Sequence, residues 1–342
     1  MLAGAVGVGL TLLAVRQVGL DHLAESFVRS SPSLVLVAFV LMVASMLLRA
    51  VSWHAIVTAA LPDRKIRRRD IASGTMIGVL MSATLPARLG EPARATVVSR
   101  RIGRVRETFP VLIGTLVSQT MLNILALVML GVIIVSTTDL FHRNQEAVFA
   151  ISSIPVLLLA VVVFAPVLLR ARGDGQTARG LASARRALFR VRSGLRVFQR
   201  PRAAAIATSA QLAAWGLQLL SCWVLLHALE LDTQVGIGAA AAALFAVNVT
   251  AVVPATPSNI GIFQLAVISV LTTGYGVAKG DALAYGIILQ AVEIATAVAV
   301  GVPALVREGF SWSDMRLRAL QATPVTLSPV GSRDTRVPDT SE

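Results

Sequence analysis

Long apolar runs separated by short polar segments form the hydrophobic pattern of this chain. A helix that crosses a bilayer needs about 20 mostly apolar residues, because its backbone polar groups must be hydrogen-bonded within the helix. Six runs approach or exceed that length, and each is predicted to be a full membrane span. They cover residues 2–20, 34–61, 109–137, 147–169, 203–229 and 282–306.

Two further apolar stretches are interrupted. Residues 71–85 are rich in Gly, Ser and Thr and end at Pro86, whereas residues 235–271 are broken in the middle by Pro254 and Pro257. Proline removes a backbone donor, and broken helices occur at membrane depth only where protein or a cavity covers the backbone. We therefore expect two re-entrant or broken-helix hairpins in an all-α polytopic bundle. The alternative is a bundle of eight full spans.

The charge distribution supports this layout. The predicted cytoplasmic segments hold 25 of the 31 Lys and Arg residues, in agreement with the positive-inside rule. The chain then has two halves of inverted topology, about residues 1–138 and 147–306, within one membrane domain of residues 1–310. Inverted repeats with broken helices are typical of transporters, whose substrate site lies near the midplane. Both termini are expected in the cytoplasm, and the polar tail 311–342 is expected to be disordered.

Composition agrees with a protein of the cytoplasmic membrane. Only 14% of the residues are charged, against about 25% in soluble domains. The net charge of +13 resides mainly in short loops beside apolar spans, so nucleic acid is not an expected partner. Ten arginines from Arg170 to Arg202 alternate with apolar residues at helical spacing. This pattern predicts an amphipathic segment that binds anionic lipid headgroups.

Several kinds of chemistry have no support in the sequence. A single cysteine, Cys222, excludes an intrachain disulfide and a cysteine-cluster metal site. The chain also lacks a phosphate-binding glycine loop, a dinucleotide fingerprint and a His-Glu-x-x-His pair. No cofactor and no metal are therefore expected.

At the two breaks the sequence resembles the lysylphosphatidylglycerol synthase transmembrane-region family, a group of flippase-like membrane proteins. Residues 85–94, LPARLGEPAR, are close to that family's Pro-x-Arg-x-Gly-Glu core and the basic stretch after it. Residues 254–264, PATPSNIGIFQ, correspond to its Pro-Gly-Gly-hydrophobic-Gly-x-x-Glu motif, with Ser258 and Asn259 replacing glycines and Gln264 replacing the acid. The resemblance covers about residues 1–310. It implies movement of a lipid or lipid-linked headgroup between leaflets, and no aminoacyltransferase domain is expected here.

Charged residues inside apolar segments are the main candidates for substrate binding, since each costs about 2.5 to 3.5 kcal/mol at the centre of a membrane helix. Arg88, Glu91 and Arg94 lie close together at the first break. We expect Arg88, together with Arg94, to bind a lipid phosphate and Glu91 to orient or pair with an arginine. The alternative is an Arg–Glu pair that only holds the hairpin. Glu293 lies mid-span with Gln290 on the same face; it is a candidate to balance an arginine, exchange a proton or contact a headgroup, or to form a structural hydrogen bond.

Polar residues around the second break are candidates for lining a cavity. They include Asn248, Ser258, Asn259 and Gln264, of which Asn259 and Gln264 are the predicted substrate contacts. The freed backbone groups of a broken helix need such partners even without a substrate, so a structural role is the alternative.

Other polar residues on the spans are expected to be structural. Arg49 is predicted to snorkel or to pair, and His54 to be a satisfied structural residue. Two polar faces on different spans are predicted to hydrogen-bond between helices. They consist of Gln119 and Asn123 on one span and Gln211, Trp215 and Gln218 on another.

Three functions are compatible with these features. The first is a flippase or transporter for an anionic phospholipid or lipid-linked headgroup. The second is a membrane-embedded transferase that acts on a lipid carrier, with Glu91 or Glu293 as the base. The third is a non-catalytic scaffold subunit that uses the arginine-rich segment. Opposed hairpins favour the first, because a flippase needs a pathway reachable from both faces. A homo-oligomer or a partner enzyme is compatible with each.

Overall fold

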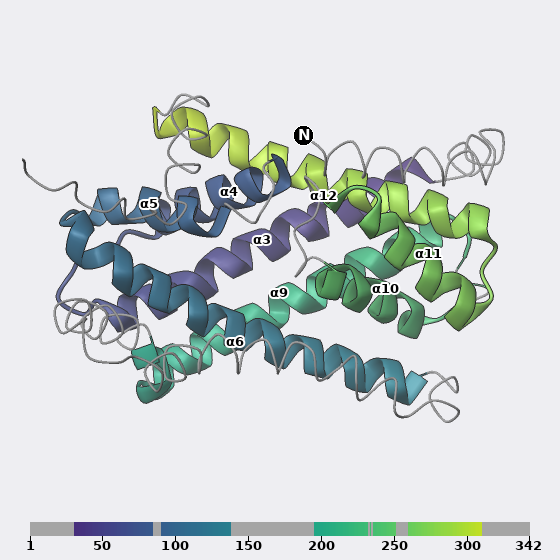
Figure 1. Ribbon diagram of the computed structural model, residues 1–342, viewed down its shortest axis with the longest axis horizontal. Coiled ribbons are helices and arrows are strands. Elements are labelled where there is room, and N and C mark those ends of the chain that lie inside the picture. Colours follow the sequence, from purple (N-terminus) through teal and green to yellow (C-terminus); the bar gives the residue numbers. More distant parts are fainter. Residues whose placement is uncertain are drawn as a thin grey trace, which may run out of the picture.

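The computed structural model describes residues 31–84, 90–137, 195–231, 233, 235–250 and 259–309, and the regular secondary structure within them is entirely helical. Figure 1 shows the longer helices running mostly along the long axis of the molecule. The predicted all-α polytopic bundle is therefore confirmed. The predicted spans 2–20 and 147–169, most of the arginine-rich segment and the tail 311–342 lie outside the described residues.

Four helices are long and apolar enough to cross a membrane by length and composition. With 28 to 33 residues each, they agree closely at both ends with predicted spans. Large apolar side chains on their outer surfaces remain exposed, such as Leu36 at 61% and Val132 at 63%, as expected for a surface that faces lipid. The four are α3 (Pro32–Ala60), α6 (Val105–Thr137), α9 (Pro201–Ala228) and α12 (Lys279–Arg307).

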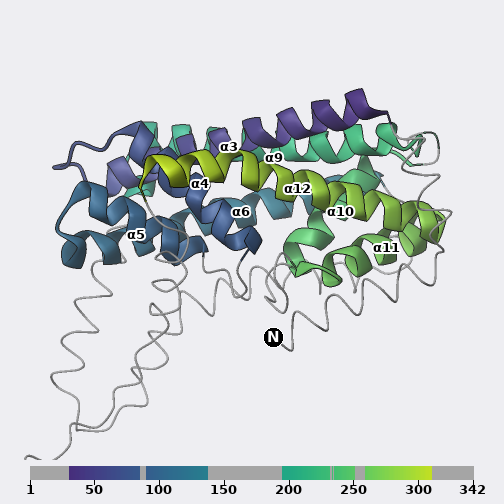
Figure 2. The ribbon, with the colours of Figure 1, turned by 90° about the horizontal axis from the view of Figure 1, so that it is seen from above.

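Two pairs of shorter helices complete the described bundle. Helix α4 (Arg68–Thr84) packs on α5 (Gly90–Ile102), and α10 (Ile237–Thr250) packs on α11 (Ile262–Tyr275). Each has 13 to 17 residues, fewer than the about 20 that a full span needs. Figures 1 and 2 place the first pair toward one end of the long axis and the second pair toward the other. These lengths and positions fit two opposed hairpins better than eight full spans.

An antiparallel pair, α3 and α9, forms the centre of the bundle. The backbone N–H of Ser31, just before α3, donates to the carbonyl oxygen of Ala228 at the end of α9, at 3.0 Å. Each hairpin packs on a long helix of the other half. Helix α4 of the first half packs on α12 of the second, and α10 of the second half packs on α6 of the first. Each hairpin is thus held by helices of both halves.

Hydrogen bonds between α3 and α9 recur with a fixed spacing. Ser52 Oγ donates to the carbonyl oxygen of Ala207 at 2.8 Å, and Ser221 Oγ donates to that of Ala38 at 2.8 Å. Ser221 lies 169 positions after Ser52, and Ala207 lies 169 positions after Ala38. Exchanging the two halves turns one bond into the other, so a pseudo-twofold axis relates the two helices.

The same relation extends to α6 and α12. Trp53 Nε1 donates to Thr115 Oγ1 at 3.0 Å, and the Tyr285 hydroxyl donates to the carbonyl oxygen of Cys222 at 3.0 Å. Cys222 follows Trp53 by 169 positions, as Ser221 follows Ser52. Tyr285 follows Thr115 by 170 positions. Corresponding positions are therefore bonded in both halves, which fits an internal repeat of the described helices; the inverted orientation of the halves in a membrane stays a prediction.

The first hairpin is packed more closely than a side chain would allow. Gly74 and Gly78 lie on one face of α4, and a Cβ atom added to Gly78 would lie 2.9 Å from the Gly90 carbonyl oxygen. Small residues four positions apart permit such close helix contact in membranes. In the second half, a Cβ atom on Gly286 would make an ordinary 3.5 Å contact with Val267.

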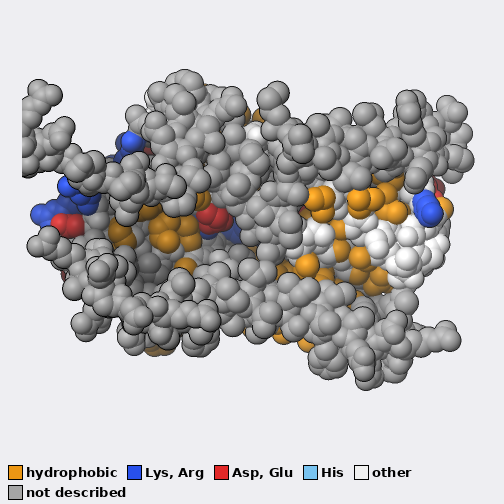
Figure 3. Space-filling view, viewed as in Figure 1, with side chains coloured by type: hydrophobic (Ala, Val, Ile, Leu, Met, Phe, Trp, Pro, Cys, Tyr) orange, Lys and Arg blue, Asp and Glu red, His pale blue; other side chains and the backbone are white. Residues whose placement is uncertain are grey.

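The two ends of the bundle differ in charge. Of the 16 Lys and Arg residues in the described part of the chain, 13 flank the helix ends that meet at one end, and Lys279 lies at the other. Figure 3 shows basic side chains gathered at the left end of one face. At this end Arg101 Nη2 lies 2.6 Å from Glu308 Oε2, which joins α5 to α12. The hydrogen bond and charge of Glu308 raise the pKa of the Arg101 guanidinium.

The end of the arginine-rich segment differs from the predicted amphipathic α-helix. Residues Leu195–Gln199 form a 3-10 helix, and Arg200 is extended before Pro201 opens α9. A residue before proline is sterically disfavoured from the α conformation, which explains the break. Val197 is buried in a hydrophobic cluster with α3 and α6, so this part belongs to the bundle.

Candidate functional site

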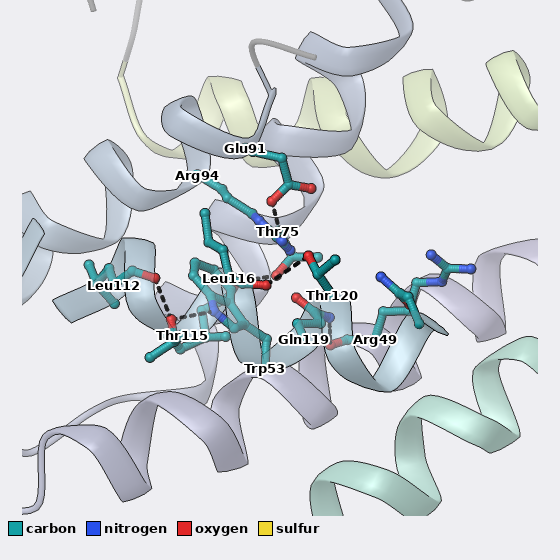
Figure 4. A network of polar contacts seen from close by, with 12 residues as sticks. Arg49, Trp53, Thr75, Glu91, Arg94, Leu112, Thr115, Leu116, Gln119 and Thr120 are labelled. Carbon is teal, nitrogen blue, oxygen red and sulfur yellow. Dashed lines mark hydrogen bonds and ion pairs between the residues drawn. The ribbon is translucent and has the colours of Figure 1, made fainter. Parts of the chain in front are cut away.

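Arg94 and Glu91 form an ion pair in the first turns of α5. The Arg94 side chain is 11% exposed and that of Glu91 is 50% exposed. The Arg94 guanidinium lies 4.8 Å from the ring centroid of Trp53 on α3, a distance typical of a cation–π contact. Figure 4 shows Arg94 reaching from α5 toward Trp53. The predicted pairing of Glu91 with an arginine is confirmed for Arg94.

Local structure explains this arrangement. Glu91 lies at the start of α5, where the unsatisfied N–H groups and the helix dipole favour a carboxylate. A Cβ atom on Gly78 would lie 2.9 Å from the Arg94 Cβ atom, so the glycine permits Arg94 to lie against α4. Trp53 is held by its hydrogen bond to Thr115 of α6. The ring that faces Arg94 is therefore fixed by a third helix.

Arg49 lies one turn before Trp53 on α3 and points toward α9. It donates a hydrogen bond to Gln218 Oε1, and its guanidinium lies 5.3 Å from the ring centroid of Trp215. Of its two predicted roles, snorkelling and pairing, the structure supports pairing. The buried Nε atoms of both Arg49 and Arg94 have no hydrogen-bond partner among the described residues.

Glu293 occupies the middle of α12. It lies at the midpoint of this 29-residue helix, about 21 Å from each end at 1.5 Å per residue. Its side chain is partly buried. Within the described part of the chain, no hydrogen bond and no ion pair within 4.0 Å involves its carboxylate. Its charge nevertheless acts on Arg49.

Four charges thus converge from three helices. Arg94 of α5, paired with Glu91, lies over the ring of Trp53, one turn from Arg49 on α3, and α12, which carries Glu293, packs on α3. The structure brings three predicted site residues, Glu91, Arg94 and Glu293, into one electrostatic cluster with Arg49. We call these four residues the charge cluster.

The two polar faces predicted to join helices meet in the structure. Gln211 Nε2 and Trp215 Nε1 of α9 both donate to Asn123 Oδ1 of α6, at 2.6 and 3.0 Å. Gln119 Nε2 donates to Gln211 Oε1 at 3.2 Å. The prediction of interhelical hydrogen bonds is therefore confirmed for these four residues, which we call the amide network.

At the second break, Gln264 connects two helices. Its Oε1 accepts from the Gly261 backbone N–H at 2.7 Å, and its Nε2 donates to Gln290 Oε1 on α12. The amide caps the first turn of α11 and is 3% exposed. Asn259 is partly buried in a left-handed conformation with φ of 52°. The substrate contacts assigned to Asn259 and Gln264 stay predictions.

Sequence reasoning treated Arg49 as a separate structural residue and did not single out Trp53. A signal was present, because the two lie about one helical turn apart in an apolar helix and therefore share a face. Arg88 and Ser258 lie outside the described residues. Asn248 bonds to the Leu244 carbonyl oxygen of its own helix at 2.8 Å.

The charge cluster is suited to binding a polar group at membrane depth. Two guanidinium groups with unused N–H donors can bind a phosphate, and the aromatic rings beside them cover the arginines. Among the described residues, no group of three His, Cys, Asp or Glu side chains is arranged to hold a metal ion.

A comparison with known families agrees with the motifs and the fold. The family model described as the lysylphosphatidylglycerol synthase TM region matches residues 1–301. No curated protein matches the sequence. The match includes both hairpins and all four residues of the charge cluster. Because it spans most of the chain, this protein belongs to the lysylphosphatidylglycerol synthase TM region family, whose members include membrane proteins related to lipid handling.

Proposed function

We propose that this protein moves an anionic phospholipid, or a lipid-linked headgroup, between the two leaflets of a membrane. The observation that carries the proposal is the charge cluster, because Glu293 lies at the midpoint of a membrane-length helix that packs on α3, the helix of Arg49. Charges at this depth are costly and usually mark a pathway for a polar substrate.

The headgroup phosphate binds between Arg49 and Arg94. Each arginine has a buried Nε that is unpartnered among the described residues, and a phosphate oxygen is a strong acceptor for it. Glu91 keeps Arg94 oriented through their ion pair. The acyl chains remain in the bilayer beside the exposed apolar surfaces of the helices. Arg88, in the adjoining part of the first break, is a further phosphate ligand in this proposal.

The orientation follows from the charge difference between the ends. The basic end faces the cytoplasm under the positive-inside rule, and the membrane is the cytoplasmic membrane. The first hairpin then opens from the cytoplasmic side and the second from the opposite side. The segment from Arg170 to Arg202 binds anionic headgroups at the cytoplasmic surface.

A leaflet-exchange measurement tests the proposal. Purified protein is reconstituted in liposomes with phosphatidylglycerol labelled on an acyl chain, and dithionite quenches the label in the outer leaflet. Wild-type protein should expose nearly all of the label, whereas protein-free liposomes protect about half of it. Arg94→Gln and Arg88→Ala should slow exchange at least tenfold, because a charged hydrogen bond is worth about 1.5 to 3 kcal/mol and a factor of ten corresponds to about 1.4 kcal/mol.

Arg307→Gln is the matched control. Arg307 is exposed at the basic end of α12, so its loss removes the same charge without touching the charge cluster. Exchange should stay at the wild-type rate. If wild-type protein exchanges none of several anionic lipids, the proposal is wrong and the transferase and scaffold functions become the better candidates. A scaffold predicts that neutralising Arg185 to Arg200 abolishes function while Arg88 is dispensable.

A further inference from the structure

The inverted repeat allows two residues of the charge cluster to be compared with the residues at corresponding positions of the other half. Under the spacing that relates Ser52 to Ser221, Gln218 of α9 corresponds to Arg49 of α3. Under the spacing that relates Thr115 to Tyr285, Asn123 of α6 corresponds to Glu293 of α12. The second half therefore has a neutral amide, Gln218, where the first half has Arg49. The first half has a neutral amide, Asn123, where the second half has Glu293.

Asn123 has a structural role at the position that corresponds to Glu293. Asn123 accepts hydrogen bonds from Gln211 and Trp215 and so joins α6 to α9. The framework can therefore be held at this position by a neutral side chain. Because a charge costs about 2.5 to 3.5 kcal/mol at membrane depth, Glu293 needs an explanation other than helix packing, whereas Arg49 also joins α3 to α9 through Gln218.

Arg49 is shared between two partners. It bonds to Gln218 and stacks near Trp215, yet the Glu293 charge also acts on it. No ion pair within 4.0 Å joins Arg49 to Glu293 in the described structure. Its Nε has no hydrogen-bond partner among the described residues, so a donor remains for an anion.

From this arrangement we propose that Glu293 carries a proton that crosses the membrane together with one anionic headgroup, so that lipid movement is driven by a proton gradient. The inference rests on the proposed function and adds its energy source and its stoichiometry.

Charge counting gives the coupling. Glu91 and Arg94 neutralise each other through their ion pair, which leaves Arg49 and Glu293. With a proton on the Glu293 carboxyl, the four residues of the charge cluster carry one positive charge, which one phosphate monoanion balances; Arg88 keeps the same charge in both protonation states of Glu293. After the proton leaves, the Glu293 carboxylate competes with the phosphate for Arg49 and expels it. Proton and headgroup thus favour each other's binding, as linkage requires.

Among the described residues, few other ionisable groups face Glu293, and Arg202 and His227 lie at the two ends of α9. Arg49 faces it from α3, and Glu91 and Arg94 of α5 act through Arg49. The charge of Glu293 also acts on two neutral groups, the Cys222 thiol of α9 and the Tyr285 hydroxyl of α12. The charged residues of α4 lie in its first turn, and α11 contains none. The proton is therefore assigned to Glu293.

The wild-type protein provides the first test. Liposomes contain labelled phosphatidylglycerol, potassium and valinomycin hold the membrane potential at zero, and the pH differs by one unit across the bilayer. Protons moving toward the alkaline side carry the lipid with them. The probe should therefore become enriched in the leaflet that faces the alkaline compartment, up to tenfold at one proton per lipid. Pyranine inside the liposomes should report proton entry that depends on the protein.

The outcomes separate the two proposals. Equal distribution of the probe despite rapid exchange would overturn proton coupling and leave the flippase standing. Absence of exchange at every pH would overturn the proposed function and the coupling with it.

Variants then assign the coupling to Glu293. Glu293→Gln should abolish the enrichment, and Asp281→Asn, which removes a carboxylate from the first turn of the same helix, should keep it. Enrichment that persists in a folded Glu293→Gln protein contradicts the assignment. If that variant shows no exchange, Glu293→Asp decides the matter, because it retains a carboxyl: gradient-driven enrichment in this variant supports the proposal, and its absence counts against it.

Discussion

The two halves of the bundle share a framework but differ in the polarity of its centre. Ser52 and Ser221 make equivalent hydrogen bonds across the α3–α9 pair, so the packing is alike. At corresponding positions the halves nevertheless hold Arg49 or Gln218, and Asn123 or Glu293. The amide network joins α6 to α9 and leaves one buried acceptor, Gln119 Oε1, without a partner, whereas the charge cluster leaves two arginine Nε donors and the Glu293 carboxylate unused among the described residues. The difference separates residues that build the framework from residues that act on a substrate.

The largest expected effect tests the closer packing of the first hairpin. Gly78→Ala should destabilise the protein by about 1 to 3 kcal/mol, because its Cβ atom would overlap the Gly90 carbonyl oxygen. Thermal unfolding in detergent measures the loss. Gly286→Ala, in the second half, makes an ordinary contact with Val267 and should be tolerated. Equal losses in both variants would mean that the hairpins do not differ in packing.

The next variant gives the charge cluster the neutral amides found at the corresponding positions of the repeat. The double variant Arg49→Gln with Glu293→Asn carries the amides found at the corresponding positions. It should stay folded with nearly the wild-type melting temperature, because the two charges are removed together. Leaflet exchange should fall about ten- to hundredfold, from the loss of a charged hydrogen bond worth about 1.5 to 3 kcal/mol. Unchanged exchange would show that the cluster is structural.

A smaller effect is expected when the amide network is broken. Asn123→Leu removes the acceptor shared by Gln211 Nε2 and Trp215 Nε1. Stability should fall by about 1 to 2 kcal/mol, the upper range for interhelical hydrogen bonds in membranes. Thermal unfolding measures the change. Asn248→Leu is the control, since Asn248 bonds only within its own helix in the described structure, and it should have little effect.

The smallest expected effect concerns the ion pair at the basic end. Arg101→Gln removes the ion pair with Glu308 but keeps a side-chain donor for this carboxylate, and with Arg101 48% and Glu308 6% exposed the loss should be about 1 kcal/mol. High salt should reduce the difference from wild type. Arg104→Gln serves as comparison, because Arg104 and Glu107 are both largely exposed at 3.7 Å, and it should cost nothing measurable. A larger loss for Arg104 would contradict the ranking by exposure.

Most of the described fold could be predicted from local patterns. The apolar runs located α3, α6, α9 and α12 closely at both ends, because a membrane span is defined by length and hydropathy. The helix pair α4–α5 was harder to delimit, since α4 begins at Arg68 inside the basic loop and α5 is strongly charged. Helix α4 contacts α5 closely at Gly78 and also packs on α12, and residue order alone does not show these contacts.

The candidate site was predicted only in part. Glu91, Arg94 and Glu293 were recognised because charges are rare in an apolar chain. Arg49 was not assigned to them, since it is distant along the chain from Glu91 and lies in the other half from Glu293. Gln264 was predicted as a substrate contact, and the structure shows its amide engaged in a helix cap and a bond to Gln290.

The sequence by itself determined the membrane environment, the positions of the four apolar spans within the described residues, the two breaks and the charge asymmetry. These depend on composition and on spacing along one helix, which the chain carries locally. Tertiary structure alone decided which polar residues meet. The antiparallel α3–α9 pair and the exchanged hairpins bring together side chains from three helices, and that placement results from long-range packing. Polar side chains from both halves therefore meet as an amide network between α6 and α9 and as a charge cluster of α3, α5 and α12.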